Sequence, residues 1–336
     1  MIDTPEELAG TPGLTSGGSN FDLLADVLDR VRLSGALFLR GEYTSPWAFS
    51  SPGHCDLLDL LAPDARRLLI FHVVRQGTGW IAAGSTRLAV EAGDLVVLAH
   101  SDPHQVGTHD YRSVVPIAEV LPPQPWSGIP TLRCGGGGAP LSMICGYFRC
   151  DEMLFESLLR HLPPVFKVRP TGYAAELLEA CIGYACEQSE KPGGAALLVR
   201  VPEVLLLEAL RLHAETNVAR QGWLAAATDP VVGRALKLIH DEPARDWTAE
   251  ELARLAHTSR SVLGDRFRAL LGKSPIHYLI EWRMQLAAEL LRSTHLKLAA
   301  VAEEVGYGSE AAFSRAFARH VGTSPAQWRD TPSRRA

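Results

Sequence analysis

The sequence has 336 residues, 46% hydrophobic and 21% charged, a composition typical of an ordinary globular protein with room for two domains. No apolar run reaches the roughly 18–20 residues of a membrane span, and the acidic N-terminus MIDTPEELAG lacks the regions of a signal peptide, so we expect a cytoplasmic protein. The net charge of −5 by itself argues against nucleic-acid binding, and the six cysteines, without CxxC or zinc-finger spacing, are predicted to be free thiols.

The N-terminal part of the chain is predicted to be β-rich, after a disordered leader and a short helix. Residues 1–20 are rich in Gly, Ser, Thr and Pro and predict a disordered leader, and residues 21–32 place apolar side chains at helical spacing. Short β-type runs separated by turn residues follow: GALFLRGEYT, RRLLIFHVVRQGTGWIAAG, STRLAVEAGDLVVLAH and LSMICGYFRC. Strands at this spacing predict an antiparallel sandwich or barrel.

Glycines mark the turns expected in this region. Gln76-Gly77 and Ala83-Gly84 predict hairpins, and residues 91–94 predict a turn into an apolar strand. The four consecutive glycines 135–138 favour a flexible hairpin loop. A ligand-contacting loop is the alternative, but a phosphate loop needs a helix start, and a strand-like run follows here.

Residues 171–216 change to helical periodicity. The segments YAAELLEACIGYACEQSE and ALLVRVPEVLLLEALRLHAE predict two amphipathic helices, with Pro202 near the start of the second or kinking it. The leucine-rich face of the second helix needs a partner: Leu205, Leu206, Leu207 and Leu210. That face can pack on the barrel or on a second subunit; we favour the second and expect a homodimer. Residues 217–228 are the predicted linker.

Residues 229–330 contain one pattern twice. The copies read ARLAHTSRSVLGDRFRALLGKSP and AEEVGYGSEAAFSRAFARHVGTSP, and the Phe, Gly and Ser-Pro positions return 50 residues later, from Phe267 to Phe317. Each copy predicts helix, tight turn, helix, the unit that a DNA major groove accepts. Residues 229–336 carry 16 Lys and Arg against 13 Asp and Glu, a net charge of +3, which leaves −8 for the front. This asymmetry supports a nucleic-acid reader joined to an acidic body.

Capping signals place the helices of this region. Thr248 and Glu251 predict a capping box, Ser259 caps the next helix, and Gly272 ends it. Ser274, followed by a proline, opens a long connecting helix. Two units joined by this helix could enter successive major grooves, about 34 Å apart.

The second helix of each unit carries the predicted DNA contacts. In the first unit these are Arg260, Ser261, Gly264, Asp265, Arg266 and Arg268. In the second unit they are Ser309, Glu310, Ala311, Ala312, Arg315 and Arg319. A merely solvated helix face is the alternative, and the duplication of the whole unit argues against it.

The segment GYGSEAAFSRAFARHVGTSPAQWR is similar to the signature of AraC/XylS-family transcription regulators. The residues that fall on the signature are Gly306, Phe313, Arg315, Phe317, Gly322, Ser324 and Pro325. The resemblance covers about a third of the chain, residues 229–330, and implies an all-α domain that binds double-stranded promoter DNA, with RNA polymerase as a further partner. It implies that Ser261, Gly264 and Asp265 lie on the first recognition helix, and residues 309–312 with Arg315 on the second.

Two residues depart from the family pattern. Asp265 stands where the family commonly carries Arg, and a carboxylate repels phosphates, although it can accept from a cytosine amine. Gly264 weakens the same helix by about 1 kcal/mol relative to Ala. We therefore expect the second unit to contribute more binding than the first.

Residues 21–170 resemble the small cupin-type barrel that some AraC-family regulators carry at the N-terminus. The resemblance rests on Pro46-Trp47, FHVVRQGTGW, EAGDLVVLAHSDPH and CGYF. Metal-binding cupins use a His-x-His and a Glu in one motif and a His in a second, because a metal needs several convergent ligands. Here Val74 and Gln76 follow His72, and only His104 fits the second motif, so we expect no cofactor; His72 and His104 are the remaining metal candidates.

The candidate effector contacts of this barrel are His72, Trp80, His104 and Cys145. The alternative is that these residues belong to the barrel core or make only internal hydrogen bonds.

The resemblance implies a one-component transcription regulator: a barrel that binds a small-molecule effector, helices that dimerise, and a double helix-turn-helix that reads a promoter, with no enzymatic activity and no membrane partner. The alternatives are a cupin-type metalloenzyme fused to a DNA-binding domain, which the missing ligands at Val74 and Gln76 oppose, and an interaction protein whose helical units bind protein.

Overall fold

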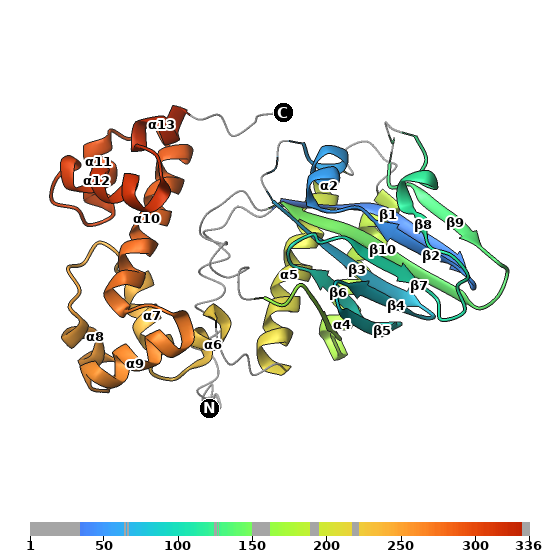
Figure 1. Ribbon diagram of the computed structural model, residues 1–336, viewed down its shortest axis with the longest axis horizontal. Helices are drawn as coiled ribbons and strands as arrows, with labels where there is room; N and C mark the ends of the chain where they lie inside the picture. Colours follow the sequence, from blue (N-terminus) through green and yellow to red (C-terminus); the bar gives the residue numbers. More distant parts are fainter. Residues whose placement is uncertain are drawn as a thin grey trace, which may run out of the picture.

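The computed structural model describes residues 34–63, 65, 67–123, 126, 128–149, 162–188, 195–216 and 222–330. The predicted leader, the helix expected at residues 21–32, Cys150 and the first part of the predicted linker lie outside these residues. Figure 1 shows a β-rich N-terminal part and an all-helical C-terminal part, which confirms the α+β organisation expected from the sequence. Within the described residues, none of the helices combines the length and the apolar character that crossing a membrane requires.

The β-rich part consists of two sheets that face each other. Its strands are β1 (Ser34–Thr44), β2 (Ala48–Ser51), β3 (Leu68–Gln76), β4 (Thr78–Ala83), β5 (Thr86–Glu91), β6 (Leu95–Leu98), β7 (His104–Gly107), β8 (Val115–Pro116), β9 (Thr131–Gly135), β10 (Pro140–Arg149) and β11 (Val165–Val168). The first sheet has the order β11-β6-β3-β10-β1-β9, and the second has the order β5-β4-β7-β2-β8. The pairs β1–β9 and β2–β8 are parallel, and the others are antiparallel.

Of the sandwich and the barrel expected from the spacing of the strands, the described residues form a sandwich of two open sheets. Closure would require the edge strands of one sheet to pair with those of the other. Among the described residues, the edge strands β9 and β11, and β5 and β8, each pair with one neighbour only. The space between the sheets stays open toward α2 (His54–Leu61) and the segment after β8, which supply part of its lining.

Strand β3 is buried on both faces, and this explains its nearly continuous apolar run LLIFHVV. Leu68 and Ile70 belong to the core between the two sheets. Leu69 and Phe71 belong to the core between the first sheet and the helices α4 (Gly172–Gln188) and α5 (Ala195–Thr216). The helices thus cover the outer face of that sheet (Figure 1).

The leucine-rich face of α5 packs mainly on this sheet within the same chain. Leu205, Leu206 and Leu210 are buried in the core shared with the first sheet, whereas Leu207 is 40% exposed. Pro202 lies inside α5 and is buried against β1, where a Cβ on Gly35 would meet the Pro202 Cβ at 2.5 Å. The sheet of the same chain, and not a second subunit, therefore buries Leu205, Leu206 and Leu210.

Of the two expected hairpins, only the second forms. Ala83 pairs with Thr86 across the β4–β5 turn at Gly84, which confirms that hairpin. Gly77 instead connects β3 and β4, which belong to different sheets, so the chain crosses between the layers there. Gly77 has a φ of +81°, and a Cβ at this position would lie 2.1 Å from the Pro140 carbonyl oxygen.

The glycine loop 135–138 is also not a hairpin. It joins β9 to β10, which lie on opposite sides of β1, so it must pass over the end of that strand. The N–H groups of Gly136 and Gly138 donate to the carbonyls of Thr44 and Ser45, at 3.0 and 2.8 Å. These backbone bonds give the loop a structural role at the end of the sheet.

The C-terminal part is helical throughout. Its helices are α6 (Trp223–Thr228), α7 (Val232–Asp241), α8 (Ala249–Leu255), α9 (Arg260–Leu271), α10 (Pro275–Ser293), α11 (Leu298–Glu304), α12 (Glu310–Val321) and α13 (Pro325–Asp330). The predicted N-caps are confirmed: the Thr248 hydroxyl accepts from Glu251 N–H at 3.1 Å, Ser259 and Ser274 cap α9 and α10, and Gly272 ends α9 with a φ of 70°. The other half of the predicted capping box does not form, because the Glu251 carboxylate accepts from Arg245 instead.

Part of the predicted linker is a helix that belongs to this C-terminal part. The buried Trp223 on α6 donates from its indole N–H to the Tyr278 hydroxyl on α10 at 3.0 Å. The N–H of Gly222 donates to the Leu270 carbonyl of α9 at 2.7 Å. Residues 222–228 therefore move with the helical domain and do not act as a free spacer.

Candidate nucleic-acid interface and ligand cavity

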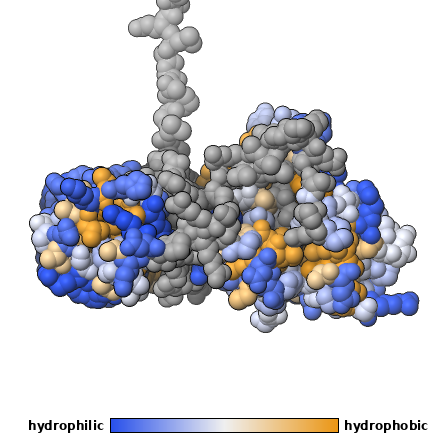
Figure 2. All heavy atoms as spheres, turned by 90° about the horizontal axis from the view of Figure 1, so that it is seen from above, coloured by the Kyte–Doolittle hydropathy of each residue, from blue (hydrophilic) through white to orange (hydrophobic). Residues whose placement is uncertain are grey.

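Two helix-turn-helix units are built from the C-terminal helices, α8 with α9 and α11 with α12, and α10 connects them. Helix α9 buries Leu263 and Phe267, and α12 buries Phe313 and Phe317, so the opposite face of each helix is left to solvent. Most predicted contacts lie on these outer faces: Arg260, Ser261, Asp265, Arg266, Arg268, Ser309, Glu310, Ala311, Arg315 and Arg319 are exposed, and Gly264 and Ala312 are half-buried. The visible surface of the helical part (left in Figure 2) is mostly hydrophilic, with one hydrophobic patch near its centre.

The three arginines on α9, the second helix of the first unit, are all paired with carboxylates. Arg260 pairs with Glu250, Arg266 with Asp229 and Arg268 with Asp265. Arg266 reaches Asp229 at 2.8 Å, and the same carboxylate accepts from Val232 N–H at the start of α7. Arg266 thus joins α9 to α7, and a phosphate would have to compete with a carboxylate for each guanidinium.

The second unit presents its arginines differently. Among the described residues, Arg315 and Arg319 form no ion pair, and both are exposed on α12. Ser309 caps the helix by accepting from Ala312 N–H at 3.2 Å, which aligns the first turn for an approach to a groove. A phosphate can therefore bind the arginines of α12 without displacing a carboxylate, whereas at the arginines of α9 it must displace one.

Sequence reasoning missed Val262 on α9. This valine is 44% exposed in the first turn of the helix, where an apolar side chain can contact a thymine methyl group. Its position between the Ser259 cap and the buried Leu263 could have identified it, because those residues fix the helix start and its buried face.

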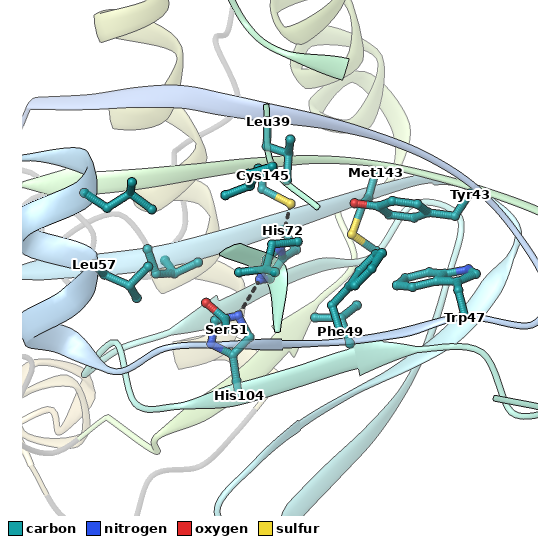
Figure 3. Close-up of a pocket in the computed structure, with 15 residues that line it drawn as sticks. Leu39, Tyr43, Trp47, Phe49, Ser51, Leu57, His72, His104, Met143 and Cys145 are labelled. Carbon is teal, nitrogen blue, oxygen red and sulfur yellow. Dashed lines mark hydrogen bonds between the residues drawn. The ribbon is translucent and has the colours of Figure 1, made fainter. Parts of the chain in front are cut away.

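A second candidate site is the cavity between the two sheets, which has an interior volume of about 50 Å³ (Figure 3). Its lining is mostly apolar: Leu39, Tyr43, Trp47, Phe49, Leu57, Leu60, Ile70, Val106, Ile117, Leu121 and Met143, with Ser51, His72, His104 and Cys145 as the polar members. The rings of Tyr43, Trp47 and Phe49 form one aromatic wall, with centroids 4.1 to 5.5 Å apart. None of the described residues that line it is Asp, Glu, Lys or Arg.

Three of the predicted effector residues form one hydrogen-bonded chain in this cavity (Figure 3). His104 Nδ1 lies 3.1 Å from the Asp102 carbonyl oxygen, which can only accept, so this nitrogen carries the proton. His104 Nε2 therefore accepts from His72 Nε2–H at 3.2 Å, and His72 Nδ1 accepts from the Cys145 thiol at 2.9 Å. Each donor in the chain has an acceptor, and the tautomer of each ring follows.

Burial keeps this chain uncharged. It lowers the pKa of His72 well below its usual value, with the neighbouring His104 as a second cause, and lowers the pKa of His104 to about 4. Burial also raises the pKa of the Cys145 thiol to about 12. At neutral pH both rings and the thiol are neutral.

The arrangement differs from the metal site and the effector contacts considered from the sequence. His72 lies between the other two side chains and bonds to each, and the described residues hold no group of three or more His, Cys, Asp or Glu placed to bind a metal ion. Trp80 does not line the cavity: its indole N–H donates to the Thr108 carbonyl at 2.8 Å, and the Arg87 guanidinium lies 3.9 Å from its ring centroid.

Comparison with known proteins gives two family matches along the chain. Residues 22–215 match the Cupin model, and residues 252–331 match the Helix-turn-helix domain model. The chain is 35% identical over 276 residues to an AraC-like transcription regulator of Streptomyces lividans, covering 80% of this chain and 89% of that protein. It is 30% identical over 317 residues to an uncharacterised HTH-type transcriptional regulator of Haemophilus influenzae, covering 92% and 99%.

Among solved structures, the DNA-binding domain of AdpA, in complex with a target DNA, is 31% identical. That match covers 30% of this chain and 91% of the other, with a TM-score of 0.29.

Proposed function

This chain belongs to the AraC-like transcription regulators with a cupin sensor domain, and we propose that it is a one-component regulator in which a small uncharged molecule at the N-terminal cavity controls promoter binding. As a member of this family it is a DNA-binding regulator and not an enzyme, so the metalloenzyme alternative is excluded.

Helices α9 and α12 enter two successive major grooves on one face of the DNA. The observation that carries this proposal is the repeated unit: two helices with the same serine cap, the same buried Phe and the same left-handed glycine end are held on one connecting helix. Predicted contacts are the six residues on each helix named from the sequence. The unpaired Arg315 and Arg319 give the second unit the larger electrostatic contribution.

A gel-shift experiment tests the DNA proposal. Duplexes selected from a random pool by the wild-type protein are titrated with wild type, Arg315→Ala and Ser261→Ala. We expect Arg315→Ala to weaken binding about tenfold, the size of one good base or phosphate contact, and Ser261→Ala to weaken it less. Equal or reversed losses would contradict the unequal contribution, and binding without salt dependence would contradict phosphate contacts altogether.

The cavity takes an uncharged, largely apolar effector. An ionised ligand would be buried beside neutral histidines, a neutral thiol and apolar side chains, which is costly without a counter-charge. A neutral molecule with one hydrogen-bonding group suits this lining, because Ser51 and the histidine chain supply a few polar atoms at one end.

The preference for an uncharged ligand can be tested with a neutral and an ionised probe that have the same number of carbon atoms. Quenching of tryptophan fluorescence, to which Trp47 in the cavity wall contributes, is measured with 1-octanol and with octanoate. We expect saturable quenching with the alcohol and at least tenfold weaker binding of the carboxylate. The control variant is Val106→Phe, whose larger side chain fills the cavity and should abolish the quenching by 1-octanol. Equal binding of both probes would contradict the charge argument.

The outer face of α4 is the proposed homodimer interface. Tyr173, Leu177 and Tyr184 lie on the side opposite the buried Ile182 and are 89%, 57% and 54% exposed. An apolar helix stripe of this kind is self-complementary across a two-fold axis. In analytical ultracentrifugation we expect Tyr184→Lys to lower the dimer fraction, whereas Val262→Lys, at an exposed apolar site on α9, should leave it unchanged.

Regulation in this proposal acts through the junction between α5 and α6. A ligand can shift the regulator only if it binds one arrangement of the two domains better than another. Because α6 is fixed to α9 and α10, it changes position together with the helical domain when the arrangement changes. RNA polymerase is the proposed further protein partner.

A further inference from the structure

One buried arginine joins the two helix-turn-helix units. Arg283, on α10, is 8% exposed, and its guanidinium donates to three backbone carbonyls. Its Nε donates to Pro243 at 2.7 Å, its Nη2 to Arg245 at 2.8 Å and its Nη1 to Gly306 at 3.2 Å. The planar guanidinium holds its donors in a fixed fork, so these bonds define the relative positions of the carbonyls.

The three carbonyls belong to different units. Pro243 and Arg245 lie in the loop that leads into α8 of the first unit, and Gly306 lies in the turn between α11 and α12 of the second. The two backbones are in direct contact at this point: a Cβ on Gly306 would lie 2.4 Å from the carbonyl oxygen of Ala244. The units therefore meet at a second joint besides α10, and Arg283 lies across it.

Burying the charged guanidinium of Arg283 at this joint is energetically unfavourable. Burial lowers the pKa of Arg283, and within the described residues it forms no salt bridge; its hydrogen-bond partners are neutral carbonyls. A buried charge held in this way is a poor device for stability alone, and fixing a geometry is the best-attested use of such groups. Arg283 does not reach the exposed faces of α9 or α12, so it acts on DNA binding through the position of other residues.

We propose that Arg283 is a positioning residue that fixes the spacing and rotation of the two recognition helices, so that the protein reads the distance between two half-sites as well as their sequences. This inference rests on the proposed two-groove binding. Without the guanidinium the units stay connected by α10 but can rotate about it, and binding to two grooves then loses its dependence on spacing.

The experiment measures spacing dependence with the full-length protein. A site selected from random DNA by wild type is compared with the same site carrying one extra base pair between the half-sites, which turns the second half-site by about 35°. A third duplex keeps only one half-site. Affinities are measured for wild type, Arg283→Met, Arg283→Lys and Arg329→Met. Arg329 is the matched control, because its guanidinium donates to the Leu296 carbonyl at 2.6 Å within the C-terminal half of the domain.

For wild type and Arg329→Met, we expect the inserted base pair to weaken binding at least tenfold. For Arg283→Met, we expect about tenfold weaker binding to the original site, less than threefold dependence on spacing, and half-site binding within twofold of wild type. Arg283→Lys, which keeps the charge but loses the fork, should lie between.

Two results would overturn the proposal, and they are distinguishable. If Arg283→Met loses half-site and full-site binding equally, or keeps the wild-type spacing dependence, the residue has no positioning role. If that variant does not fold, as judged by circular dichroism, Arg283→Lys decides in the same way. If wild type itself shows no dependence on spacing, two-groove binding fails and the inference fails with it.

Discussion

The neutral histidine chain makes the stability of the sensor domain depend on pH, and His104→Gln tests this. His104 is 3% exposed, and burial lowers its pKa from 6.5 to about 4. Between these values only the unfolded chain binds the proton, so stability is present above pH 6.5 and falls as the pH drops. Lowering the pH from 7 to 5 should cost about 2 kcal/mol through His104 alone. Glutamine can still accept from His72 and donate to the Asp102 carbonyl, but it does not titrate.

The measurement is urea unfolding at pH 7 and pH 5, followed by tryptophan fluorescence, for wild type and His104→Gln. The difference between the two proteins cancels the other titrating groups, provided that the variant folds at pH 7. We expect wild type to lose about 2 kcal/mol more than the variant between the two pH values. Equal losses would refute the argument, because they would mean that His104 ionises alike in the folded and unfolded chain.

Three further outcomes follow from the helical domain. Arg319→Ala should lower the slope of log affinity against log salt by about 1, and Arg268→Ala by less, because its carboxylate partner already competes for the guanidinium; gel shifts in a salt series measure both. Ser274→Ala removes the cap of α10 and should cost about 1 kcal/mol in thermal unfolding. Gly306→Ala should cost at least about 1 kcal/mol in the same assay, because φ is +79° and the new Cβ would approach the Ala244 carbonyl; an unchanged melting temperature would contradict the close backbone contact.

The sequence by itself determined the helical domain, because local signals there agree with the tertiary fold. Thr248, Ser259 and Ser274 cap the helices that they were expected to cap, since an N-cap bond involves only neighbours in the chain. Gly272 and Gly322 end α9 and α12 for the same reason, because a left-handed residue at a helix end is a local choice. The duplicated pattern then specified the double unit without any long-range information.

Features that depend on residues far apart in the chain were decided only by the tertiary structure. Gly77 reads as a hairpin glycine, but whether two consecutive strands pair or belong to different sheets depends on their distant partners. An amphipathic helix such as α5 reveals that one face is buried but not which surface buries it. Its pattern leaves the sheet and a second subunit both open as partners, and the sheet of the same chain covers most of its leucines. The histidine chain joins residues 32 and 73 positions apart.

The same limit applies to the joint between the two units. The sequence specifies each helix-turn-helix, because caps and buried phenylalanines act within a few turns. The contact of Arg283 with carbonyls 23 to 40 residues away exists only when both units are folded against each other. The packing of the helices likewise decides whether an arginine is paired with a carboxylate. Arg266 and Asp229, for example, are 37 residues apart in the chain and meet only in the folded domain.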